Sequence, residues 1–109
     1  LIGKGKSMEL QMTAQMIDAQ EALRLGLVNY VTPSDDLLTR TKEILAVINS
    51  KAPLAVAKII ECINHAVTNN NYSGFEKEVE AFGFTFGTED MLEGTQAFLE
   101  KRKASFKGK

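Results

Sequence analysis

The sequence is poor in the residues that carry covalent and redox chemistry, since its 109 residues include one cysteine, one histidine, two prolines and no tryptophan. A single thiol cannot form an internal disulfide, and Cys62 lies in an apolar helical pattern, so we expect a buried, inert thiol in a reducing compartment. No apolar run approaches the roughly 18 residues of a membrane span, and no signal-peptide pattern is present, which favours a protein without a membrane partner. The 25% of charged and 44% of apolar residues are typical of a globular chain.

The sequence also lacks a recognisable catalytic or metal-binding arrangement. His65 is the single histidine, and no cysteine or carboxylate cluster accompanies it. The 14 acidic residues lie mostly at helix caps or between apolar stripes, where a solvated carboxylate is the ordinary outcome. Gly3-Lys4-Gly5-Lys6 lacks the spacing of a Walker phosphate loop, and no aromatic residues interleave with a basic stripe as in nucleic-acid binding. We therefore predict no catalytic residue, no metal and no nucleic-acid partner for this chain.

Helix signals follow one another along the whole chain. Apolar residues recur at helical spacing, and the segments are separated by caps or breakers at Asp18, Gly26, Pro33, Pro53 and Thr88. The pattern predicts helices over 4–14, 18–25, 33–48, 53–67, 73–86 and 89–103, a polar turn at 69–71 and one short strand or extended segment at 27–31. The expected fold class is therefore mainly α, with five or six helices and at most one short strand.

The last third of the chain carries more specific expectations. Gly83 lies inside a predicted helix and needs a packing reason, because glycine lowers helix stability by about 1 kcal/mol relative to alanine. The nearby rings should point in different directions, since they are spaced by two along the helix: Phe82, Phe84 and Phe86. Phe98 and Lys101 are three apart in the last predicted helix, so an aromatic ring and an ammonium should share one face. The basic residues crowding the last nine positions suit a phosphate-bearing ligand or, alternatively, a solvated and frayed end.

Four segments together resemble the C-terminal region of the enoyl-CoA hydratase/isomerase (crotonase) family over essentially the whole chain. They are Gly3-Lys4-Gly5-Lys6-Ser7-Met8-Glu9-Leu10, the stretch from Asp18 to Asn29, the stretch from Ala81 to Asp90, and Ala97-Phe98-Leu99-Glu100-Lys101-Arg102-Lys103. The resemblance implies that residues 1–109 are a single helical C-terminal region, of the kind that makes trimer contacts, and that the catalytic spiral core lies upstream. The start at Leu1, in mid-pattern and without methionine, likewise suggests a piece of a longer polypeptide.

The same resemblance implies a function for the parent enzyme and a site on this chain. The parent would add water across the 2,3-double bond of an enoyl-CoA thioester in fatty-acid metabolism, using two glutamates and two backbone amides that this chain lacks. Phe98 and Lys101 match the aromatic residue and the lysine that reach the adenine and phosphate end of coenzyme A. The implied partners are an acyl-CoA substrate and identical subunits, as a trimer or hexamer, with no cofactor beyond the thioester. The implied compartment is the bacterial cytoplasm, or else the mitochondrial matrix.

Two other interpretations stay open on the sequence alone. The chain could be a non-catalytic assembly module of another member of the family, such as an isomerase or dehydratase, with Phe98 in a core and the basic tail in solvent. It could instead be a free-standing helical protein that binds acyl-CoA. On every interpretation the 109-residue chain by itself is predicted to be inactive, and its uncovered apolar stripes predict a dimer or larger assembly.

Overall fold

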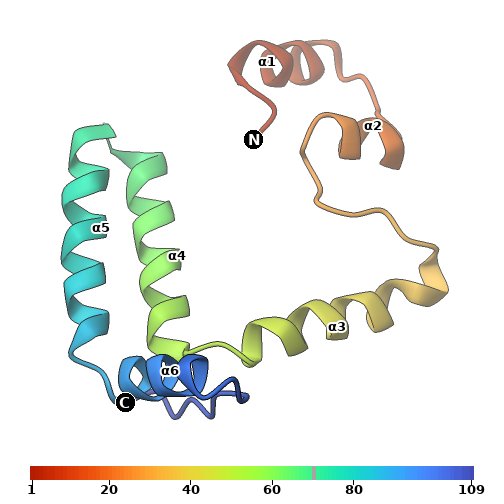
Figure 1. The fold of residues 1–109 in the computed structure, drawn as a ribbon. Helices are drawn as coiled ribbons and strands as arrows, with labels where there is room; N and C mark the ends of the chain where they lie inside the picture. Colours follow the sequence, from red (N-terminus) through yellow and green to blue (C-terminus); the bar gives the residue numbers. More distant parts are fainter. Residues whose placement is uncertain (70) are drawn as a thin grey trace. The chain divides into compact units, whose positions relative to one another are not determined.

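The computed structural model describes residues 1–69 and 71–109 and divides into two units, 1–41 and 42–109. Over the described residues the chain has six α-helices, one 3₁₀ helix and no strand (Figure 1). The predicted fold class is confirmed, and the predicted strand or extended segment at 27–31 forms no strand. Residues 27–29 form a bend instead, and the Leu27 amide donates to the Ala22 carbonyl at 2.9 Å, which completes the end of the preceding helix.

The first unit holds two short helices, α1 (Lys4–Thr13) and α2 (Ala19–Arg24). Asp18 caps α2 as predicted, because its carboxylate accepts the Glu21 amide at 2.7 Å. Glu21 itself forms an ion pair with Arg24 rather than reaching back toward the cap. Gly26 ends the helix with a φ of +74°, the left-handed conformation that glycine adopts without a clash.

A 3₁₀ turn (Ser34–Asp36) leads into α3 (Leu37–Asn49), and the boundary between the two units falls within α3. The turn is preceded by Pro33, as the sequence pattern predicts. Apolar residues at helical spacing account for α3, whose larger side chains remain exposed: Leu37, Leu38, Leu45, Val47 and Ile48.

The second unit is built on a helical hairpin of α4 (Pro53–Thr68) and α5 (Asn71–Phe86), which lie side by side (Figure 1). Helix α6 (Glu89–Leu99) follows and contacts α5. The helix predicted to begin at Ser73 already includes Asn71, so Ser73 lies inside it. Asn70, in the middle of the predicted turn, lies outside the described residues.

Few side chains are buried in this structure. In residues 1–69 and 73–109, the buried apolar residues are the three alanines Ala22, Ala81 and Ala97, and no large side chain is fully buried. Residues of the hairpin that the sequence places on apolar stripes, such as Ile60 and Ile63, are more than half exposed. Because apolar surface is normally removed from water on folding, these helices present faces that fit a further protein surface.

Candidate functional site

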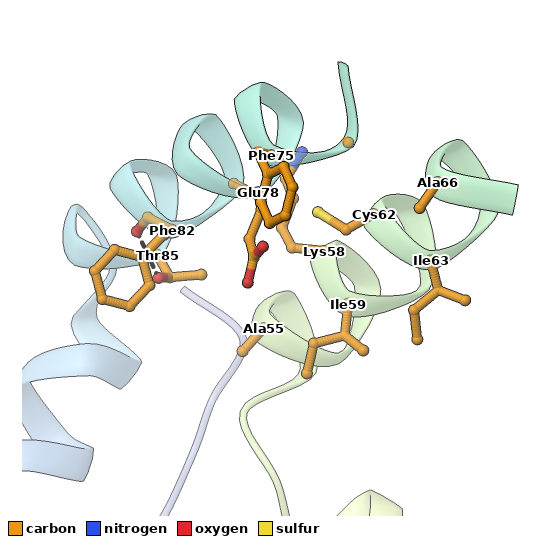
Figure 2. A pocket seen from close by; sticks show the side chains of 12 residues that line it. Ala55, Lys58, Ile59, Cys62, Ile63, Ala66, Phe75, Glu78, Phe82 and Thr85 are labelled. Atoms are coloured by element: carbon orange, nitrogen blue, oxygen red, sulfur yellow. Dashed lines mark hydrogen bonds between the residues drawn. The ribbon is translucent and has the colours of Figure 1, made fainter. Parts of the chain in front are cut away.

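Helices α4 and α5 form an open groove of about 620 Å³ along one face of their hairpin (Figure 2). Ile59 and Ile63 line it from α4, and Phe75 and Phe82 line it from α5. These four side chains are 57% to 68% exposed. Neither Phe98 nor Lys101 is among the lining residues. The groove is therefore an apolar face of the hairpin and is separate from the predicted coenzyme A residues.

Lys58, Glu78 and the Cys62 thiol line this groove, and Lys58 also belongs to an ion-pair network outside it. Glu61 accepts Lys58 at 2.8 Å and Lys77 at 2.7 Å, and these hydrogen bonds lower the pKa of Glu61 to about 2. The Cys62 thiol donates to the Lys77 carbonyl at a sulfur–oxygen distance of 3.7 Å. Cys62 is half-buried on the groove wall, so its predicted full burial is wrong. The reason is that Cys62 lies on the wall of the open groove between α4 and α5.

The phenylalanines of α5 divide between two directions. Phe82 and Phe86 are one helical turn apart and their ring centroids are 4.8 Å apart, whereas Phe84 lies under the Lys58 ammonium at 4.9 Å. The predicted divergence holds for Phe84 only, because residues four apart share a helix face. All three rings are at least half exposed.

His65 and Ser73 connect the two helices near the turn of the hairpin. The Nε2 atom of His65 lies 3.3 Å from the Ser73 hydroxyl, and its Nδ1 atom lies 3.3 Å from the Asn69 side-chain nitrogen. No group of histidine, cysteine and carboxylate ligands suited to a metal ion occurs in the described part of the chain. The contacts of His65 tie α4 to α5.

The end of α6 brings Phe98 and Lys101 together by an unexpected route. The helix ends at Leu99 rather than at Lys103, so the predicted shared helix face is wrong. Lys101 instead has a φ of +53°, and its amide donates to the Phe98 carbonyl at 3.2 Å. The Arg102 amide donates to the Ala97 carbonyl at 3.0 Å. This pair of bonds is a Schellman motif, which reverses the chain just past the helix.

The two predicted site residues are both available to a ligand. The Phe98 side chain is 82% exposed. The Lys101 ammonium has no hydrogen bond or ion pair with any described residue. An exposed aromatic ring and an uncommitted ammonium three residues apart suit a ligand that carries both a flat ring and a phosphate.

The neighbouring Arg102 is fully engaged. Its guanidinium binds both oxygens of Glu93, at 2.7 and 2.9 Å, and one oxygen of Glu100 at 2.6 Å. Glu93 also accepts the Ser105 amide at 2.8 Å. The guanidinium and this amide together lower the pKa of Glu93 to about 2, and the two carboxylates raise the pKa of Arg102.

Residues 103–109, which we call the C-terminal strap, run back along α6. Asp90, which is 3% exposed, accepts the amides of Lys107 at 2.6 Å and Gly108 at 2.8 Å. The Phe106 ring lies where a Cβ atom on Gly94 would be 3.2 Å away, which explains a glycine inside α6. The alternative expectation of a frayed basic end is therefore wrong, because α6 supplies carboxylates and an open helix face that hold the strap.

The strap alternates between half-buried and exposed residues. Ala104, Phe106 and Gly108 are half-buried, and the exposed positions between and around them are Lys103, Ser105, Lys107 and Lys109. The amines of the strap therefore sit on its outer side. Sequence reasoning missed the anchors Asp90 and Glu93, since it assigned them to the solvated face of a helix. The available signal was two acidic residues three apart in the first turns of a helix, followed by a basic segment.

The site offers binding groups and no acid/base pair for catalysis in the described residues. Glu93 and Asp90 are committed to Arg102 and to strap amides, and Glu61 is committed to two lysines. Of the described helices, none is both long and apolar enough to cross a lipid bilayer.

Comparison with known proteins gives a consistent result over the full chain. The sequence model of the family described as "Enoyl-CoA hydratase/isomerase" matches residues 1–109. The chain is 42% identical over 106 residues to the Crotonyl-CoA hydratase of Syntrophomonas wolfei subsp. wolfei. That match covers 97% of this chain and 41% of the hydratase. It is 44% identical over 103 residues to the Short-chain-enoyl-CoA hydratase of Clostridium acetobutylicum, covering 94% of this chain and 40% of that protein.

A solved structure agrees with these sequence matches. The chain is similar to the crystal structure of an enoyl-CoA hydratase from Bacillus anthracis, with a TM-score of 0.96 and 39% identity. That match covers 100% of this chain and 42% of the other. The chain therefore spans about 40% of the length of the relatives it matches.

Proposed function

The chain belongs to the enoyl-CoA hydratase/isomerase family, and from that premise we propose that it is the helical C-terminal region of an enoyl-CoA hydratase. In this proposal it contributes part of the coenzyme A site and the contacts between identical subunits. The whole enzyme adds water across the 2,3-double bond of an enoyl-CoA thioester in fatty-acid metabolism, in the bacterial cytoplasm or the mitochondrial matrix. The thioester is its substrate, and no other cofactor is proposed.

The observation that carries the coenzyme A assignment is the pairing of Phe98 and Lys101 at the end of α6. The 82% exposed ring of Phe98 offers a face on which adenine can stack. The Lys101 ammonium, without an ion-pair partner in the described residues, offers a compact charge to a phosphate. The Lys101 amide donates to the Phe98 carbonyl at 3.2 Å, which fixes the spacing of the two residues at the end of α6, and in this proposal both side chains contact one ligand.

The proposed subunit contacts rest on the apolar groove and stripes of the hairpin. Ile59, Ile63, Phe75 and Phe82 expose more than half of their side-chain surface in this chain. Contiguous apolar surface of this kind usually meets a protein partner. In the proposed enzyme those partners are the catalytic core and neighbouring subunits.

The proposal assigns catalysis to residues outside this chain. We expect the purified 109-residue chain to show no hydration of crotonyl-CoA, because its described carboxylates are engaged or solvated and form no acid/base pair. Turnover by the purified chain above a mock preparation would contradict this expectation.

A second candidate function is assembly alone, in an isomerase or dehydratase of the same family. The observation in its favour is the small number of buried apolar side chains in the described residues, which an assembly role explains by itself. In that case Phe98 and Lys101 would not contact substrate. A third candidate, a free-standing acyl-CoA-binding protein, predicts that the isolated chain binds coenzyme A in a titration.

Replacing Lys101 by glutamate in the full-length enzyme separates these functions. Lys101→Glu replaces attraction for phosphate with repulsion, so KM for crotonyl-CoA should rise about tenfold at low salt, with little change in kcat. The defect should be smaller for crotonyl-pantetheine, which lacks the nucleotide. Lys103→Glu is the matched control, since it makes the same charge change two residues away. Equal losses on both substrates, or a change in oligomer size, would favour the assembly role.

A further inference from the structure

We propose that Arg102 is a positioning residue, which with Glu93 holds Lys101 in the left-handed conformation from which its ammonium meets the ligand's phosphate. This inference rests on the proposed coenzyme A site and identifies what builds that site. It adds Arg102 and Glu93 to the residues that determine specificity, although neither touches the ligand.

The backbone of Lys101 adopts an unfavourable conformation. Its φ of +53° is a conformation that costs a residue with a Cβ atom about 1–2 kcal/mol. The equivalent position at the end of α2 is occupied by Gly26, which adopts a φ of +74° without that cost. The same Schellman motif therefore ends both helices, and only the one at α6 uses a strained residue. Ala14, at the end of α1, adopts a similar φ of +52° with only a methyl side chain, so the conformation alone does not imply a ligand. What distinguishes Lys101 is that its strained backbone carries an ammonium with no partner in the described residues.

The hydrogen bonds of Arg102 with Glu100 and Glu93 hold the strained residue in place. Lys101 lies between Glu100 and Arg102, and the Arg102 guanidinium returns to Glu100 at 2.6 Å. The same guanidinium binds Glu93, nearly two turns earlier in α6, in a two-oxygen fork at 2.7 and 2.9 Å. Such bidentate pairs fix orientation as well as distance. The backbone on the C-terminal side of Lys101 is thereby anchored to the helix.

Of the neighbouring cations Lys101 and Arg102, Lys101 is the one available to a ligand. The Arg102 guanidinium makes three bonds to carboxylate oxygens and a fourth, at 3.3 Å, to the Lys103 carbonyl. With four of its bonds committed, it is poorly placed to bind phosphate. Lys101, with no such bonds in the described residues, is the group that remains available. Arg102 therefore acts through Lys101.

The Arg102–Glu93 pair is linked to the C-terminal strap. The Glu93 oxygen that accepts Arg102 Nη1 at 2.7 Å also accepts the Ser105 amide at 2.8 Å. Asp90 holds the strap further along through two amides. Breaking the Arg102–Glu93 pair therefore releases the segment that follows Lys101 at its nearest anchor, and leaves the distant anchor at Asp90 intact.

A double-mutant cycle in the full-length enzyme tests this inference. The readout is the ratio of kcat/KM for crotonyl-CoA to that for crotonyl-pantetheine, which isolates recognition of the nucleotide from folding and chemistry. Arg102→Gln should lower this ratio about fivefold in the wild-type background and by less than about twofold in the Lys101→Gln background. Glu93→Gln, which breaks the same pair from α6, should reproduce the effect. Lys103→Gln, the matched loss of one nearby charge, should change the ratio by less than about twofold.

The outcomes distinguish failure of the proposed coenzyme A site from failure of the positioning role of Arg102 alone. An unchanged ratio in Lys101→Gln would refute the proposed coenzyme A site itself. A ratio that falls in Lys101→Gln but not in Arg102→Gln would overturn the positioning role alone. Equal effects of Arg102→Gln in both backgrounds would overturn it too, by placing Arg102 against the ligand. Arg102→Lys should not restore the ratio, because a lysine cannot form the two-oxygen fork; full restoration would overturn the positioning role, because a positive charge alone would then be sufficient.

Discussion

Replacing Lys101 by glycine should stabilise the folded protein while it weakens the proposed site. Relief of the left-handed backbone gains about 1–2 kcal/mol, because the Cβ clash disappears. Glycine also makes the unfolded chain more flexible, which offsets about 0.4–1 kcal/mol. Loss of the exposed lysine side chain, which has no ion pair in the described residues, changes stability by no more than about 0.5 kcal/mol. The expected net gain is about 0.5–1 kcal/mol.

Lys101→Ala is the control, because alanine removes the same side chain and keeps the Cβ atom in the left-handed position. We expect Lys101→Gly to be more stable than Lys101→Ala by about 1 kcal/mol in urea unfolding of the full-length protein at one fixed protein concentration. Gly26→Ala should show the reverse sign, with a loss of about 1 kcal/mol, since it puts a Cβ atom at a φ of +74°. Equal stability of the glycine and alanine variants at 101 would refute the claim that this residue is strained.

Three further predictions concern other parts of the chain. Gly83→Ala should stabilise α5 by about 1 kcal/mol in chemical denaturation, since no described atom outside its chain neighbours and its own helix backbone lies within 4 Å of the position its Cβ would take; destabilisation of the full-length enzyme would reveal another surface packed there. The pKa of Glu93 is lowered from 4.5 to about 2, so its contribution to holding the strap is fully present above pH 4.5 and is lost as the pH falls through about 2. NMR titration of the Glu93 carboxyl and of the Ser105 amide should show a shared midpoint near the lower value, and a Glu93 midpoint near 4.5 would contradict it. The purified 109-residue chain should form a dimer or larger assembly in light scattering because its hairpin stripes are exposed, and a strictly monomeric mass at high concentration would count against this.

The parts of the fold that sequence patterns predicted well are those with local causes. The Asp18 cap and the Gly26 stop involve residues within one or two turns of each other, and both form as expected. No strand forms at 27–31, because a β-branched run needs a partner strand and the Leu27 amide is instead used to end α2. The end of α6 was misplaced for a related reason, since Lys101 gives no glycine signal for a left-handed residue.

The anchoring of the strap was beyond sequence reasoning because its contacts are long-range. Asp90 meets Lys107 and Gly108, and Glu93 meets Ser105, across 12 to 18 residues of chain. Spacing rules describe neighbours on one helix and cannot place a segment that folds back along it. The reason for Gly94 appears only when the Phe106 ring is seen against it, whereas no described neighbour explains Gly83.

Binding of the nucleotide half of coenzyme A by itself tests the central claim most directly. Adenosine 3′,5′-bisphosphate carries the adenine and phosphates without the acyl chain, so its affinity for the full-length enzyme, measured by calorimetric titration, reports on this site alone. We predict that Phe98→Ala weakens binding about tenfold through loss of stacking, and that Lys101→Gln weakens it about fivefold, with Lys103→Gln close to wild type. Wild-type affinity in both the Phe98 and Lys101 variants would contradict the assignment of this segment to the coenzyme A site.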